Sequence, residues 1–287
     1  MESGGGRHRV GTAFAVVALL VGALISVDVA APEPVDAAVE LPAGWVTDTV
    51  VSGLDVPVGM AWTGDGRLLI AEKSGVVRMW DPASGLLPAP FIDISAQVNS
   101  ARDRGLLGIA VHPEWPVTPH VFLLFTYDPP EVYQNPPGRG GPDGKGKRAS
   151  RLIRVSANPV DDHRTASPAT EVVMLGANST AATIGDLDAP MNDFLDPPFV
   201  TACEDQVTGD PLPDCLPADS ESHSIGSVRF GTDGMLYVGN GDAASYTTVD
   251  PRALRSLDLD SMAGKIFRID PWTGQGPSDN PHWTGDG

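Results

Sequence analysis

Cysteine and positive charge are both scarce in this sequence. Only two cysteines occur among 287 residues, which is too few for a zinc site or another thiolate-based metal centre. Lysine and arginine together number 19 against 37 acidic residues, so the formal net charge is −18. A chain with this charge repels nucleic acid and anionic membrane surfaces. We therefore exclude nucleic-acid binding and a thiol-based metal or redox role.

Long stretches with helical periodicity are also lacking. The chain contains 32 glycines and 27 prolines, and residues of these two types interrupt helices and mark turns. The length allows one large domain or two small ones. We expect an all-β fold.

The N-terminus has the composition of a secretory signal peptide. Arg7 and Arg9 precede an apolar run over residues 10–27, and an Ala/Pro-rich stretch follows at 29–38. Residues 1–37 are predicted to be the signal, with small residues at 35–37 as the cleavage site. The run is long enough that an uncleaved membrane anchor is the alternative. Otherwise the protein is expected to be secreted or periplasmic, with no stable membrane insertion.

The stretch 221–242 is predicted to be a hairpin with a histidine at its mouth. Alternating apolar residues flank an Asp-Gly turn at 233–234, the strongest short-range signal for a hairpin. Antiparallel strands start and finish on the same side. His223 should therefore lie beside Gly241 and Asp242.

The hairpin belongs to a repeated unit. Residues 58–72 align with 226–240 through their Asp-Gly turns, and 75–85 align with 264–274 over a further strand and turn. A looser copy has its first strand at 107–111, its second at 121–127 and its third at 151–155, and short runs at 91–95 and 171–175 are candidate outer strands. Repeated four-stranded units predict a β-propeller. The predicted innermost strands are residues 58–62, 107–111 and 226–230.

Three blades cannot close a propeller. The third predicted blade lacks an outer strand, so we expect residues 38–287 to be the N-terminal part of a longer protein with about three of its blades. Long loops interrupt the repeats at 129–150, at about 178–220 and at 243–262. The second loop carries Cys203 and Cys215, which we expect to form a disulfide in an exported chain. Two unrelated free thiols are the alternative.

Polar residues from different blades should converge at the channel mouth. The loops that enter the innermost strands supply Asp103, Arg104 and His223, and the loops between second and third strands begin at 72–73, 127–128 and 241–242. An imidazole beside carboxylates suits general acid–base catalysis. A capped turn histidine is the other interpretation of His223.

Three other motifs are interpreted as structural. Residues 141–148 resemble a phosphate-binding loop, but Arg148 stands where Ser or Thr must meet magnesium. His112 should lie at the opposite face from the mouth. An acidic loop could bind calcium; its residues are Asp186, Asp188, Asn192, Asp193 and Asp196. These residues lack the spacing of a calcium loop, and a hydrated loop is the favoured interpretation. We therefore assign no metal ligands.

Several motifs together resemble the glucose/sorbosone dehydrogenase family over about residues 54–281. They are Asp103-Arg-Gly-Leu-Leu-Gly-Ile-Ala-Val-His-Pro113, His223-Ser-Ile-Gly226, Phe230-Gly-Thr-Asp-Gly234, Gly241-Asp242, Ala263-Gly-Lys-Ile-Phe-Arg-Ile-Asp270 and Asp279-Asn-Pro281. The resemblance implies a six-bladed propeller that uses pyrroloquinoline quinone and calcium to oxidise a sugar and then passes electrons to an acceptor.

The resemblance also assigns roles. His223 would be the general base, and Asp103, Arg104, Gly241 and Asp242 would line the cofactor and substrate pocket. The family's glucose enzymes have glutamine where Asp103 stands and an acidic residue where Ser222 stands. Most cofactor-binding groups are expected beyond residue 287, so this fragment is expected to be inactive alone. The alternative function is a non-catalytic β-propeller that serves as a binding module and has lost the cofactor site.

Overall fold

The computed structural model describes residues 41–190, 201–283 and 285. Met1–Asp48 and Thr49–Gly287 are separate compact units, and the fold described here is that of the second. The predicted signal peptide and positions 192, 193 and 196 of the acidic loop lie outside the described residues. In the described part of the chain, no helix has the length and apolar character needed to cross a membrane.

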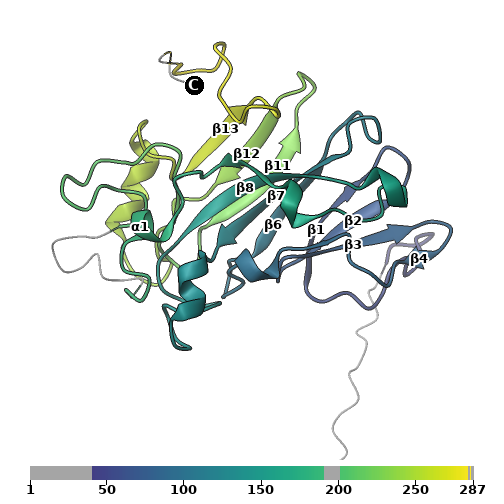
Figure 1. The fold of residues 1–287 in the computed structure, drawn as a ribbon, viewed down its shortest axis with the longest axis horizontal. Coiled ribbons are helices and arrows are strands. Elements are labelled where there is room, and N and C mark those ends of the chain that lie inside the picture. Colours follow the sequence, from purple (N-terminus) through teal and green to yellow (C-terminus); the bar gives the residue numbers. More distant parts are fainter. Residues whose placement is uncertain (1–40, 191–200, 284, 286–287) are drawn as a thin grey trace, which may run out of the picture. The chain divides into compact units, whose positions relative to one another are not determined.

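The first blade is an antiparallel sheet at the N-terminal side of this unit (Figure 1). Strands β1 (Pro57–Trp62), β2 (Leu68–Glu72) and β3 (Val76–Asp81) follow one another through tight turns, and β3 also pairs with both β4 (Gly85–Leu86) and β5 (Ile92–Asp93). The outer edge is therefore made of two short strands instead of the single strand expected at 91–95.

The second blade is the largest sheet. Its strands β6 (Leu106–Val111), β7 (His120–Tyr127) and β8 (Arg148–Ser156) are consecutive neighbours, and β8 pairs with both β9 (Val172–Leu175) and β10 (Leu216–Ala218). Strand β10 lies within the Cys-containing insertion, which was expected to be entirely loop. Its pairing with the first residues of β8, Leu216 opposite Ser150, explains why β8 begins earlier than residue 151.

The third blade has three strands: β11 (Ile225–Phe230), β12 (Leu236–Asn240) and β13 (Lys265–Ile269). The predicted Asp-Gly turn joins the first two, and Val228 lies opposite Val238. Together the sheets confirm a partial all-β propeller, with innermost strands β1, β6 and β11 where the repeat predicted them.

The innermost strands pack against each other through positions that have little room. Strand β6 contacts both β1 and β11. A Cβ atom added at Gly108 of β6 would lie 3.0 Å from Leu124 Cβ and 3.1 Å from Val228 Cγ1. The glycine of the Gly-Leu-Leu-Gly motif thus permits the close approach of the second and third blades.

The outward positions of strand β1, at the inner edge of the first blade, remain exposed. Val58, Met60 and Trp62 alternate along β1 and are 40–62% exposed, while the residues between them face β6. On the third blade, Ile266 is 80% exposed. Contiguous apolar sheet surface of this kind is usually covered by another layer.

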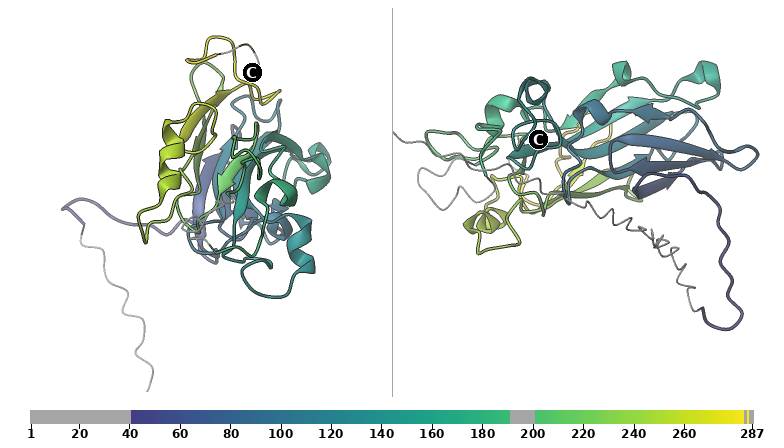
Figure 2. Two further views of the ribbon diagram at one scale, coloured as in Figure 1. Left: turned by 90° about the vertical axis from the view of Figure 1, so that its left-hand side faces the viewer. Right: turned by 90° about the horizontal axis from the view of Figure 1, so that it is seen from below.

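Two insertions gather at one end of the strands, as Figures 1 and 2 show in green and yellow-green. The first contains helix α1 (Ala181–Ile184) and β10, and the second contains the 3₁₀ helix η6 (Pro251–Leu257). The earlier insertion at 129–150 begins with the 3₁₀ helix η2 (Pro130–Gln134). All three were predicted as surface loops, yet parts of them are buried, including Arg148 and Arg252.

Cys203 and Cys215 form the predicted disulfide. The two sulfur-bearing side chains are buried in a small apolar cluster with Ala149 of β8 and Ile184 of α1. The bridge therefore fastens the insertion to the outer side of the second blade. The cluster is separate from the main core, which is formed by residues of all three sheets.

We predict that replacing both cysteines with alanine lowers the free energy of unfolding by at most about 3 kcal/mol, because the bridge closes only a short loop. Urea denaturation of the variant and the parent protein measures this difference. The three sheets should remain folded, as judged by circular dichroism. Collapse of the whole fold in the variant would show that the disulfide holds the blades together.

Candidate active site

The backbone ladder of the third blade continues past its strands and brings two loop segments together. Beyond β11 and β12, the amide of Gly241 donates to the carbonyl of Ser224 at 2.8 Å, and the amide of Ala243 donates to the carbonyl of His223 at 2.9 Å. The amide of Ser220 donates to the Ala243 carbonyl at 3.1 Å. We call residues 218–224 the entry strap. It runs beside residues 240–244 and places His223 opposite Asp242.

Gly241 is needed for this close approach. A Cβ atom there would lie 2.1 Å from the His223 carbonyl oxygen and 2.4 Å from that of Ser224. His223 itself has φ of 53°, a left-handed conformation that is unfavourable for residues with a side chain. Such backbone persists where neighbouring contacts fix it, commonly at functional sites. Here the bonds of the strap supply those contacts.

His223 and Asp242 form a hydrogen-bonded pair. Nδ1 of His223 lies 3.1 Å from Oδ1 of Asp242, which also accepts the amide of Ala244 at 2.9 Å. An ionised carboxylate can only accept, so Nδ1 carries the hydrogen and Nε2 of the neutral ring has the free lone pair. The His223 side chain is 47% exposed. The pair can therefore take a proton from a molecule outside the protein.

Arg104 lies under the entry strap, not at its surface. Its guanidinium is fully buried and donates to the carbonyls of Ala218 at 2.8 Å and Ser220 at 2.9 Å, and to that of Gly144 at 3.2 Å. Burial, aided by the nearby Arg148 charge, lowers the pKa of Arg104 to about 9. The sequence placed Arg104 in the pocket, but its donors are directed at backbone carbonyls of this chain.

Asp103 and Ser222 differ in their access to the mouth. Asp103 is exposed, and its amide is tied to the Glu221 carbonyl at 3.2 Å. Ser222 is buried, and its hydroxyl lies 3.2 Å from that of Ser220. Asp103 thus remains a candidate for contact with a ligand, whereas Ser222 supports the strap.

The other loops predicted at the mouth contribute buried ion pairs. Glu72 is buried and lies 3.8 Å from Arg78. Asp128 forms a fully buried salt bridge with Arg148 and accepts a hydrogen bond from Asn99 at 3.0 Å. These carboxylates stabilise the loops and are not presented to solvent.

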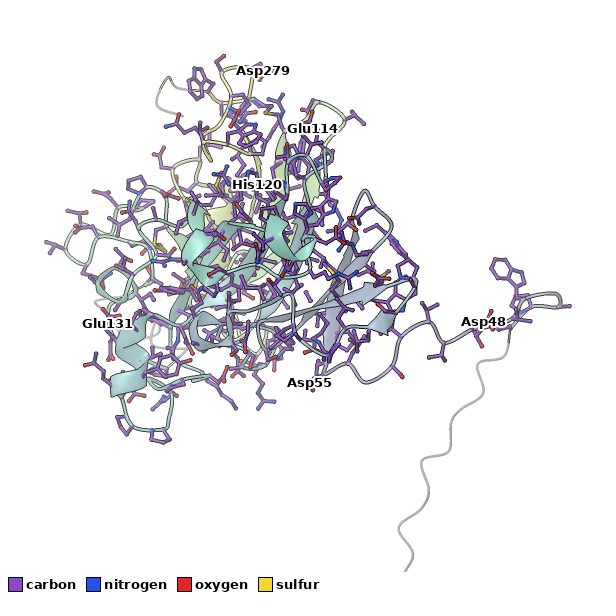
Figure 3. The ribbon with its side chains drawn as sticks, turned by 45° about the vertical axis from the view of Figure 1, so that its right-hand side comes forward. Asp48, Asp55, Glu114, His120, Glu131 and Asp279 are labelled. Carbon is purple, nitrogen blue, oxygen red and sulfur yellow. A yellow bond between two sulfur atoms is a disulfide. The ribbon has the colours of Figure 1, made fainter. Side chains whose placement is uncertain are left out.

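His112 lies at the opposite end of the strands, as predicted. In Figure 3, Glu114 marks that end, and Asp55 and Glu131 mark the other. The ring of His112 packs edge-on against Phe230 with centroids 5.3 Å apart. Burial lowers its pKa, which suits a neutral packing role.

The sequence did not reveal the buried charges that surround the strap from the other side. Asp219 and Arg255 form a salt bridge at 2.8 Å, although they lie in different insertions, 36 residues apart. The Asp-Pro-Arg start at 250–252 suggests a capped turn, and Asp250 does cap it. No local signal indicates which distant carboxylate Arg255 meets.

No group of three or more metal-ligating side chains occurs in the part of the chain that the structure describes. Within the acidic loop, Asp186 accepts the amide of Asp188, and Asp188 accepts the amide of Gly140, both at 2.9 Å. Asp186 therefore stabilises a local turn, and Asp188 joins the acidic loop to the insertion at 129–150.

The fold is thus a partial β-propeller whose mouth carries a histidine–carboxylate pair suited to proton transfer. The chain belongs to the glucose/sorbosone dehydrogenase family, whose model matches residues 54–188 and 213–287. The stretch between the matched parts lies inside the predicted Cys-containing insertion.

Solved structures with a similar fold include an oxidoreductase of Thermus thermophilus described as a putative glucose dehydrogenase. It has a TM-score of 0.50 and is 24% identical, over 84% of this chain and 51% of its own. The PQQ-bound form of aldose sugar dehydrogenase from Streptomyces coelicolor has a TM-score of 0.48 and 20% identity, over 83% and 51%. The chain therefore spans about half the length of these structures.

Two curated relatives match a shorter stretch of the chain, and neither is named as a dehydrogenase. Hedgehog-interacting protein of Homo sapiens is 39% identical over 83 residues, which is 27% of this chain and 12% of that protein. An uncharacterized protein of Synechocystis is 36% identical over 84 residues, 27% of this chain and 20% of its own length.

We predict that Gly241→Ala disrupts the His223–Asp242 pair, because the added methyl group cannot fit against the His223 carbonyl. Gly239→Ala is the matched control, since a Cβ atom there meets nothing closer than 3.8 Å. Exchange of backbone amide hydrogens with solvent in residues 218–224 and 240–244, measured by NMR, should become faster only in the Gly241 variant. Equal protection in both variants would show that the close approach is not required.

Proposed function

We propose that the protein is an exported quinoprotein oxidoreductase that oxidises a sugar, with His223 as the general base. The observation that carries this proposal is the exposed His223 ring hydrogen-bonded through Nδ1 to Asp242. Membership of the glucose/sorbosone dehydrogenase family supports the class of substrate.

The chemistry assigned to this chain is a proton transfer. Nε2 of His223 accepts the hydroxyl proton of the sugar while the carbon that bears the hydroxyl loses hydride and becomes a carbonyl. Asp242 stabilises the imidazolium that forms and keeps the free lone pair on Nε2. When bound, pyrroloquinoline quinone with a calcium ion would supply the hydride acceptor.

The described residues include a suitable general base, but they do not by themselves supply all the groups needed to bind the cofactor. Pyrroloquinoline quinone carries several carboxylates, which arginine and lysine side chains would neutralise. Arg104 and Arg148 are buried and occupied by carbonyls and by Asp128. Among the described residues, candidate contacts are exposed Asp103, the neighbouring Arg102, whose side chain is 58% exposed, and the backbone at Gly241. We accordingly propose that these 287 residues alone do not oxidise sugars.

Export is supported by the chemistry of the two cysteines. Both are in a disulfide, and structural disulfides persist in oxidising compartments. The apolar N-terminal segment of the sequence supplies the expected signal.

A propeller that binds a protein without catalysis is the second candidate. The observation that favours it is the identity with a relative named for an interaction and not for a reaction. A binding module has no use for the exposed His223–Asp242 pair as a base. Replacement of His223 would therefore leave its function unchanged.

We predict that His223→Ala in the full-length protein lowers turnover by about 100-fold or more, as loss of a general base usually does. Folding should be unaffected, because the side chain is about half exposed. His163→Ala is a control, since this ring packs on Trp115, 5.6 Å away, near the end marked by Glu114. Steady-state kinetics at saturating cofactor and calcium measure the effect. Near-normal turnover of the His223 variant would rule out its role as the base.

A further inference from the structure

A buried charge cluster lies beside the entry strap. The fully buried carboxylate of Asp219 accepts the amide of Ala202 at 2.6 Å and forms a salt bridge with Arg255 at 2.8 Å. Nη1 of Arg252 lies 3.6 Å from Oδ1 of Asp219, the oxygen that accepts the Ala202 amide. Arg252 pairs more closely with Asp250, at 2.7 Å. Asp219 is a member of the strap, four positions before His223.

Arg255 joins segments that carry both members of the catalytic pair. The Nη2 group that binds Asp219 also donates to the main-chain carbonyl of Asp242 at 3.3 Å. Nη1 lies 3.6 Å from Glu204 and 3.5 Å from the carbonyl of Ala202, in the disulfide-bonded loop. One planar guanidinium therefore connects the strap, the Asp242 peptide and the disulfide loop.

The charge state of the cluster keeps this connection in place. Burial alone would raise the pKa of Asp219, but the positive charges of Arg255 and Arg252 outweigh burial and hold it below its usual value. Asp219 is therefore ionised at neutral pH. The Arg255 side chain is only 11% exposed, so solvent does little to screen the interaction.

We propose that Arg255 is a positioning residue that holds Asp242 against Nδ1 of His223. Its contact with the Asp242 carbonyl fixes the peptide whose side chain orients the imidazole, and its contact with Asp219 fixes the strap that carries the imidazole. The consequence for turnover rests on the proposed function, whereas the consequence for the histidine ring does not.

The tautomer of His223 tests this proposal without any sugar or cofactor. In the parent chain the neutral ring should carry its hydrogen on Nδ1, and nitrogen-15 NMR distinguishes this form from the Nε2–H form. Loss of the signal in His223→Gln assigns the resonance. Asp242→Asn gives the reference for a ring whose partner is no longer a carboxylate.

Arg255→Met and Arg255→Lys should both shift the ring toward the Asp242→Asn reference. Lysine keeps a positive charge for Asp219, but its single ammonium cannot reproduce the fork of a guanidinium, so this variant should fold even if the methionine variant does not. Arg252→Met is the matched control, because it removes a charge from the same cluster without a bond to Asp242. In this control, the His223 ring should keep the tautomer that it has in the parent chain.

Retention of the Nδ1–H form in folded Arg255→Lys would overturn the proposal, as would an equal shift in Arg252→Met. In the full-length protein, Arg255→Lys should lower kcat by about tenfold, with a smaller change in KM, because misplacement of a base affects turnover more than binding. A tautomer shift in a protein that oxidises no sugar would leave the positioning role intact and contradict the proposed function.

Discussion

The close packing of the innermost strands is the constraint on which the rest of the structure depends. Strand β6 has β1 on one side and β11 on the other, and Gly108 leaves no space for a side chain between the second and third blades. The strands also finish at the same end, since Gly64 and Phe230 both lie against residues 112–115 that follow β6. The loops that precede them therefore meet at the other end, and the long insertions between the blades collect around them.

At that end, buried arginine side chains donate hydrogen bonds to backbone carbonyls, while His223 and Asp103 are exposed to solvent. Arg104 binds strap carbonyls from the side of the second blade, while Asp219 and Arg255 bind the strap and the Asp242 peptide from the side of the insertions. The left-handed His223 backbone is confined between them. These contacts hold the exposed imidazole in one orientation, as the proposed general-base role requires.

Local signals predicted the parts of the fold that local interactions determine. The Asp-Gly turns and alternating apolar residues identified the hairpins, and the repeat placed β1, β6 and β11 correctly. Strand β10 was missed because its three residues have no periodicity of their own and pair with β8 only after the insertion folds back. Antiparallel geometry likewise placed His223 beside Asp242, since both residues flank one hairpin.

Position in a loop did not reveal where a long side chain points. Arg104 lies just before the second innermost strand, as expected of a mouth residue, but its guanidinium turns inward to backbone carbonyls of the strap. The Asp219–Arg255 contact joins residues of two insertions that are 36 positions apart in the sequence. Such contacts arise from tertiary packing and have no counterpart in sequence spacing.

We propose above all that this scaffold presents a base to a sugar that lies beside the bound quinone. The most direct measurement is a titration of the full-length protein with pyrroloquinoline quinone and calcium, followed by addition of aldoses while the cofactor absorbance is recorded. We expect saturable binding of the cofactor and its reduction by at least one sugar. Absence of binding, or binding with no reduction by any sugar, would contradict it.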